Sequence, residues 1–89
     1  MTDTVKFLAS EATLTTASNV GSANIVRLVN TDNTTASTIT QKTSGGATVA
    51  TFTLGTRDSG YGCVFVMKSP SHTLEASGGT VKAVSVAYY

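Results

Sequence analysis

Gly-Tyr-Gly-Cys-Val-Phe-Val-Met-Lys, residues 60–68, is the longest dense apolar stretch of the chain. Its β-branched and aromatic residues favour a strand over a helix. In a strand with one face in water, apolar and polar residues alternate. Here both faces carry apolar side chains, with Phe65 on one and Val64 and Val66 on the other. The pattern predicts a central strand, with one face in the core and the other against a second layer or another subunit.

Two further segments complete the centre of the predicted fold. Residues 24–30, Asn-Ile-Val-Arg-Leu-Val-Asn, form a strong strand that we expect to pair with, or lie near, residues 60–68. Residues 37–42 and 47–54 flank Gly45-Gly46, and paired glycines supply the positive φ angles of a tight hairpin turn. This pattern predicts a β-hairpin.

The remaining strands are expected at residues 5–8, 12–17, 72–76 and 80–88, with Gly78-Gly79 as a second hairpin tip. Turn signals recur about every ten residues, and helical periodicity is absent from the sequence. The sequence therefore predicts an all-β fold, an antiparallel β-sandwich or small barrel of about eight short strands. We expect a single domain over residues 1–89, with residues 1–4 as a short N-terminal arm.

The composition indicates a neutral surface rich in hydroxyl groups. Charged residues make up 12% of the chain, against about 25% in typical proteins, and the net charge is +1. Seventeen threonines and ten serines replace the missing charges. The basic residues are scattered singly, which argues against a nucleic-acid partner. Few charges suit a chain that packs permanently against neighbours.

The sequence offers little chemistry for an enzyme. Cys63 is the only cysteine and lies in the apolar stretch, so we expect it to be buried and inert. His72 is the only histidine, and we expect it to face solvent or an interface. Calcium at Asp32 and Asn33 would rest on one carboxylate, which is weak support. We predict a non-enzymatic protein with no catalytic residues, no metal and no cofactor.

The loop and terminal motifs also favour structural roles. Gly60-Tyr61-Gly62 lacks the glycine spacing of a phosphate loop and predicts a bulge or a close backbone approach. Arg57-Asp58 is expected to form a loop ion pair. No segment of the sequence is long and apolar enough to span a bilayer, and we expect no signal peptide, because residues 1–20 lack a basic start followed by an apolar stretch. We therefore expect synthesis in a cytoplasm and no membrane partner.

Three segments give the chain a likeness to a known class of proteins: Val-Arg-Leu-Val-Asn at 26–30, Ala-Thr-Val-Ala-Thr-Phe-Thr-Leu at 47–54 and Gly-Gly-Thr-Val-Lys-Ala-Val-Ser-Val-Ala-Tyr-Tyr at 78–89. With them the chain resembles the small β-sandwich structural proteins of tailed-phage virions, especially head decoration (cement) proteins. The resemblance lies in the strands, which are rich in Thr and Ser and end in a strand of Val and Ala. No binding residue can be carried over from it. It implies a virion protein that stabilises the head by bridging coat subunits.

The partners implied are the major capsid protein or other virion subunits, together with further copies of the chain in a homo-oligomer, with a trimer favoured. The interface is predicted to include Arg27, Tyr61, Phe65, Met67, Tyr88 and Tyr89. The alternatives are a neck, tail or fibre component, or a module that binds a glycan or receptor through Tyr61 and Asp58.

Overall fold

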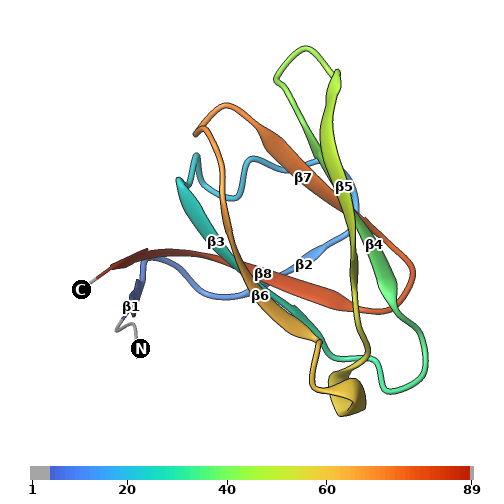
Figure 1. The fold of residues 1–89 in the computed structure, drawn as a ribbon. Coiled ribbons are helices and arrows are strands. Elements are labelled where there is room, and N and C mark those ends of the chain that lie inside the picture. The colour runs from blue at the N-terminus through green and yellow to red at the C-terminus, as the bar shows by residue number, and fades with distance from the viewer. Residues whose placement is uncertain (1–4, 89) are drawn as a thin grey trace.

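Two antiparallel sheets face each other across a hydrophobic core (Figure 1). The computed structural model describes residues 5–88, and the side chains of residues 7–87. The larger sheet has the order β1-β8-β3-β6, and β2 also pairs with β8. Its strands are β1 (Val5–Phe7), β2 (Ala12–Leu14), β3 (Ile25–Asn30), β6 (Cys63–Met67) and β8 (Val81–Tyr88). The smaller sheet has the order β5-β4-β7, with β4 (Ser37–Lys42), β5 (Thr48–Leu54) and β7 (Thr73–Ser77).

The predicted fold class is confirmed, and each expected strand has a counterpart. β4 and β5 form the predicted hairpin, which Gly46 turns at a φ of 93°. β3 pairs with β6, as expected, with Arg27 opposite Phe65. The loop expected after Leu54 contains one short 3₁₀ turn, η1 (Arg57–Ser59). The predicted N-terminal arm, residues 1–4, lies outside the described residues.

The predicted central position of residues 60–68 is wrong. The strand in this segment, β6, lies at the edge of the larger sheet and pairs with β3 alone among the described strands. β8 occupies the central place, because it pairs with β1, β2 and β3. The two apolar faces of β6 have different surroundings. Val64 and Val66 pack on the core, whereas the opposite face of the strand lies on the surface.

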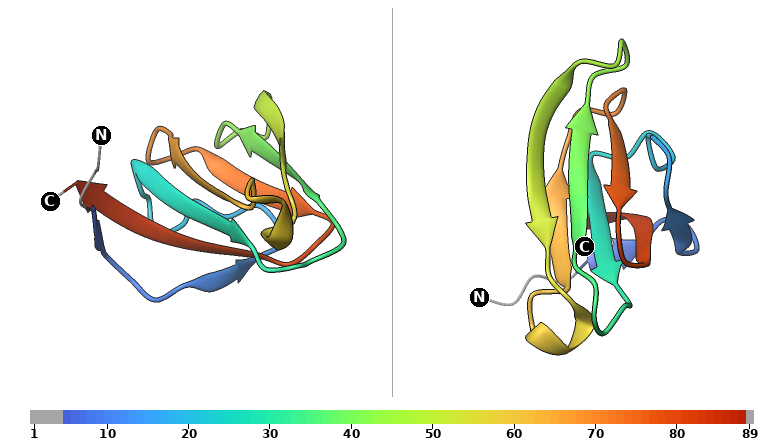
Figure 2. Two further views of the ribbon diagram at one scale, coloured as in Figure 1. Left: turned by 60° about the horizontal axis from the view of Figure 1, so that its bottom comes forward. Right: turned by 90° about the vertical axis from the view of Figure 1, so that its right-hand side faces the viewer.

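Gly78 and Gly79 do not form the expected hairpin tip. β7 belongs to the smaller sheet and β8 to the larger one, so the two glycines carry the chain from one sheet to the other (Figure 2). Both have positive φ angles, 85° and 63°. A Cβ on Gly79 would lie 2.8 Å from the Thr35 carbonyl oxygen, so the crossing requires glycine.

The core lies between the sheets and is built from alternate residues of strands β2 to β8. Val26 and Leu28 of β3 face Ile39, Leu54 and Leu74 of the smaller sheet, and all five are buried. The small residues of β8 that the sequence places on one face, Ala83 and Ser85, point into this core, where they let the sheets approach.

One side of the sandwich is closed by the chain that follows β2. Ser18 and Leu74 exchange two backbone hydrogen bonds of 2.9 and 2.8 Å, and the Ala76 amide donates to the Thr15 carbonyl at 3.3 Å. Residues 12–18 therefore pair first with β8 and then with β7, which covers the free edge of β7. The opposite side, where β5 and β6 lie at the edges of their sheets, has no such closing strand among the described residues.

Candidate interaction surface

The outer face of the larger sheet carries rows of apolar side chains that cross the strands. The strand register places Phe7, Val86, Ile25 and Met67 in one row. The next row joins Val84, Arg27 and Phe65, and a third joins Lys82, Val29 and Cys63. We call this side of the sheet the apolar face, because all side chains in these rows except Arg27 and Lys82 are apolar. This face points away from the core, so the packing of the two sheets does not bury it. Only groups outside the two packed sheets can cover these side chains.

The apolar face is covered at its middle and open at the β6 edge. Val84 and Val86 on β8 are buried, and Ile25 packs with them. On β6, Phe65 remains 47% exposed and Met67 74% exposed. The unburied part of the face is thus a strip along β6 at one edge of the sheet, with Phe7 exposed at the other edge.

The expectation that Cys63 is buried is wrong. Its side chain is exposed, because it shares the outward face of β6 with Phe65 and Met67. The apolar residues around Cys63 in the sequence indicate a hydrophobic strand. They do not indicate burial, because the outward face of a strand at a sheet edge can lie in solvent.

Arg27 lies in the middle of the apolar face and is already engaged within the chain. Its Nη1 lies 2.8 Å from Glu11 Oε2, and its guanidinium lies 6.0 Å from the centre of the Phe7 ring. Phe7, Glu11 and Arg27 line one pocket together with Val84. Arg27 therefore joins β3 to the segment of residues 7–11, which runs from β1 to β2.

The other predicted interface residues fall in different places. Tyr61 is 78% exposed and stands just before β6, where its amide donates to Ser59 Oγ at 3.1 Å. Tyr88 ends β8, opposite Val5, and its side chain lies outside the described part, as does all of Tyr89. Of the six predicted residues, the structure brings Arg27, Phe65 and Met67 together on one face.

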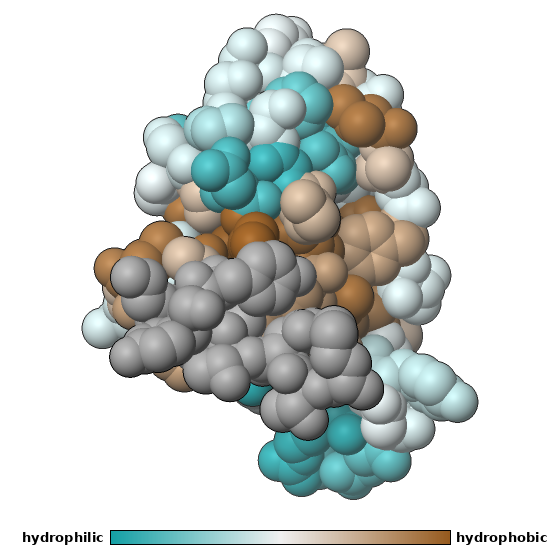
Figure 3. All heavy atoms as spheres, turned by 60° about the vertical axis from the view of Figure 1, so that its left-hand side comes forward, coloured by the Kyte–Doolittle hydropathy of each residue, from teal (hydrophilic) through white to brown (hydrophobic). Residues whose placement is uncertain are grey.

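Two further exposed apolar residues were missed from the sequence, and the strand register places one of them, Phe7, on the apolar face. Phe7 is 60% exposed and Leu8 56% exposed at the opposite edge of the larger sheet. Residues 5–8 were expected to form a strand or an edge, but nothing in so short a segment indicates which face it presents. Seen from the side on which β1 lies, hydrophobic side chains gather in a band across the middle of the molecule (Figure 3).

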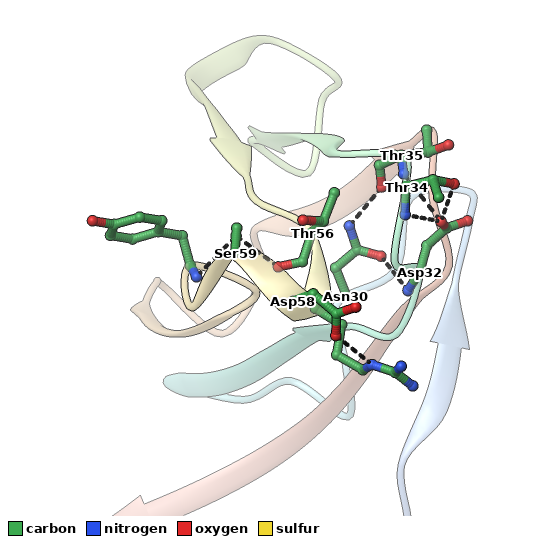
Figure 4. A network of polar contacts seen from close by, with 9 residues as sticks. Asn30, Asp32, Thr34, Thr35, Thr56, Asp58 and Ser59 are labelled. Carbon is green, nitrogen blue, oxygen red and sulfur yellow. Dashed lines mark hydrogen bonds and ion pairs between the residues drawn. The ribbon is translucent and has the colours of Figure 1, made fainter.

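A buried polar residue, Asn30, organises the loops at one end of the sandwich (Figure 4). Its amide nitrogen donates to the carbonyl oxygens of Thr35 at 2.9 Å and Gly55 at 3.0 Å. Its amide oxygen accepts from the Asp32 amide at 3.0 Å and the Thr80 amide at 3.2 Å. The side chain is therefore fully satisfied and joins four segments of the chain. The sequence marks Asn30 only as the end of a strand.

The titratable side chains serve local structure. Asp32 Oδ1 accepts from the Thr34 and Thr35 amides at 2.8 and 3.0 Å, and these hydrogen bonds hold the pKa of Asp32 below its usual range. Lys68 is buried, with Nζ 2.8 Å from the Ala23 carbonyl oxygen, and desolvation lowers its pKa. Both groups stabilise turns beside strand ends.

His72 and the loop around Gly62 make local contacts. His72 Nδ1 lies 2.9 Å from Gln41 Nε2, beside the start of β7. A Cβ on Gly62 would lie 2.9 Å from the Thr56 carbonyl oxygen, so the predicted close backbone approach is confirmed. Arg57 and Asp58 form the expected exposed ion pair at 3.3 Å.

Among residues 7–87, no three His, Cys, Asp or Glu side chains gather as a metal-binding group. Within the part of the chain that the structure describes, no helix has the length and hydrophobicity to cross a bilayer. Comparison with models of known protein families, with curated proteins and with solved structures finds no match to this chain.

Proposed function

We propose that this chain is a non-enzymatic structural protein of a tailed-phage particle, a decoration protein that bridges coat subunits. The observation that carries the proposal is the strip of exposed apolar side chains along β6, with Phe65 and Met67 at its centre. Contiguous exposed apolar surface of this kind marks protein–protein contact sites. The resemblance of the strands to those of decoration proteins supplies the class of partner.

The chemistry of the surface supports a contact made by shape and buried area. The strip carries no charged side chain between Gly60 and Met67. Aromatic residues and methionine are enriched at interface cores, and charged residues are depleted there. Arg27 and Glu11 form the nearest ion pair and border the strip. A partner would therefore bury apolar surface on β6 and meet polar groups at its rim.

The first test is the composition of the particle. Mass spectrometry of virions purified from the source of the gene should detect this chain in many copies. A particle preparation without it would refute the assignment to a virion. The second test is binding of the purified chain to particles that lack it.

In that second test, a Phe65→Ser, Met67→Ser double variant should lose particle binding, because it removes the apolar strip. Thr38→Ser with Thr53→Ser is the matched control, since these residues form a cross-strand pair on the other sheet. The control should bind like the unmodified protein. Binding that survives the loss of Phe65 and Met67 would contradict the role of the strip.

A glycan- or receptor-binding module is the second candidate, and one observation favours it. Tyr61 is 78% exposed on the loop that also carries Asp58, so an aromatic ring and a carboxylate flank one short turn. Sugar binding at this loop should disappear in Tyr61→Ala and persist in the Phe65→Ser, Met67→Ser variant. The opposite dependence would support the decoration role.

A further inference from the structure

We infer that the free edge of β6 pairs with the same edge of a second copy of this chain, in antiparallel register with Phe65 opposite Phe65. The proposal rests on the proposed function only in treating the β6 strip as an interface, and it names a second copy as the occupant. It would hold for the isolated protein, away from any particle.

The hydrogen bonds of β6 show which backbone groups are free. The Asn30 amide donates to the Gly62 carbonyl at 2.7 Å, and the Lys68 amide donates to the Asn24 carbonyl at 2.8 Å. Residues that exchange such bonds recur at every second position of an antiparallel pair. Even-numbered residues of this segment thus point their amide and carbonyl groups at β3. Cys63, Phe65 and Met67 point theirs at the open edge.

The four sheet edges differ in how well they are protected. At the edge opposite β6 the sheet ends in β1 and β2, two strands of three residues each separated by residues 8–11, and so short an edge offers little backbone for pairing. The edge of β7 is covered by residues 15–18. The edge of β5 has a register shift only at its start, opposite Gln41 and Lys42, and in the regular part of the strand its outward side chains, Thr51 and Thr53, are polar.

The edge of β6 lacks these protections. Its five residues keep one register with β3 and carry neither charge nor proline. Exposed apolar edge strands without charges or bulges are templates for pairing with another chain. Of the four edges, that of β6 is therefore the least protected against pairing with a further strand.

Self-complementarity identifies the occupant. In an antiparallel pair centred on Phe65, Cys63 of each copy lies opposite Met67 of the other, and three pairs of residues exchange six backbone hydrogen bonds. Apolar side chains meet apolar side chains at every position, and no like charges face each other. A charged partner strand would gain no ion pair here.

The geometry also predicts the size and strength of the assembly. A contact between identical antiparallel edges is isologous and closes as a dimer, in contrast to the trimer favoured from the sequence. β6 is about 17 Å long, and so short a contact buries less than the about 1,200–2,000 Å² of a standard interface. We expect a dissociation constant in the roughly micromolar to millimolar range.

The test is sedimentation of the purified full chain from about 10 µM to 1 mM. The unmodified protein should approach the mass of a dimer at the upper end. Phe65→Lys and Phe65→Glu should each remain monomers, because each places like charges opposite one another. An equimolar mixture of the two should recover the dimer, since position 65 then meets its opposite charge. Thr51→Lys on β5 is the matched control and should dimerise normally.

Cross-linking tests the register independently. Met67→Cys, with the native Cys63 retained, should give a disulfide-linked dimer under mild oxidation, because opposed residues of a hydrogen-bonded pair have Cα atoms about 5.5 Å apart. Within one chain the same positions lie about 13 Å apart along the strand and cannot bond. Thr51→Cys should give no such dimer.

A protein that stays monomeric to about 1 mM, a trimer, or a mixture that fails to recover the dimer would each overturn the proposal. Circular dichroism of every variant establishes that it is folded. Particle binding by a strictly monomeric protein would leave the decoration role intact, and a dimer absent from virions would refute that role alone.

Discussion

Replacing Asn30 with alanine should destabilise the fold more than any surface change, because one buried amide joins four segments. Asn30 is fully buried and makes hydrogen bonds to Thr35, Gly55, Asp32 and Thr80. Each such bond contributes about 0.5–1.5 kcal/mol net, and four give about 4 kcal/mol. For a domain of this size, a loss of about 4 kcal/mol lowers the melting temperature by roughly 15–30 °C.

The assay is urea and thermal unfolding of Asn30→Ala, followed by circular dichroism in the far ultraviolet. Asn30→Asp is the informative control, because it keeps the acceptor for the Asp32 and Thr80 amides but loses the donors to Thr35 and Gly55. At neutral pH it should be at least as unstable as the alanine variant, since a carboxylate would face two carbonyl oxygens. Acidification should restore part of its stability, because a protonated carboxyl can donate one hydrogen bond.

A loss below about 1 kcal/mol in Asn30→Ala would refute this reasoning. It would mean that water replaces the amide without cost, and that the four segments are held by their own backbone contacts. A loss near the expected value with unchanged β-sheet content at low temperature would identify Asn30 as a stabilising centre of the folded state.

Three further predictions concern the same end of the sandwich and the buried lysine. Gly79→Ala should destabilise the protein by about 1–3 kcal/mol in urea unfolding, because at this positive φ the added Cβ would lie 2.8 Å from Asn30 Oδ1. An unchanged unfolding midpoint would show that the loop moves without cost. The pKa of Asp32 is lowered by amide hydrogen bonds, so its carboxylate stabilises the fold above its usual pKa of 3.8 and that contribution is lost as the pH falls through the lower folded-state pKa. Asp32→Asn should lose this acid-dependent part, and identical pH profiles for the two proteins would contradict the assignment. Desolvation lowers the pKa of Lys68 below 10.5 in the folded protein. Just below pH 10.5 the unfolded chain therefore binds more protons than the folded chain, and the free energy of unfolding should rise with pH in that window. Lys68→Met should lack that alkaline rise in unfolding experiments, and a rise of the same size in both proteins would rule out Lys68 as its source.

The sequence was sufficient for the strands, since alternation, β-branched residues and turn glycines act locally. β4 begins and ends at the predicted residues, and the turn at Gly46 follows from the positive φ that glycine tolerates. The pairing of β3 with β6 was also expected, because both segments carry the most apolar side chains. Phe65 and Met67 of the predicted interface lie exposed on β6, but the sequence did not show this exposure, because exposed apolar side chains give the same sequence pattern as buried ones.

Tertiary structure alone decided which strands are central and which residues are covered. β6 has the composition of a central strand yet lies at an edge, because strand order depends on long-range pairing that no local pattern encodes. Gly78-Gly79 has the composition of a hairpin tip yet crosses between sheets, because β7 and β8 find different neighbours. Asn30 shows the same limit, since its four hydrogen bonds join residues up to 50 positions apart. The amino-acid sequence determines the local conformation of each segment, whereas burial and exposure are set by contacts that exist only once the two sheets have packed.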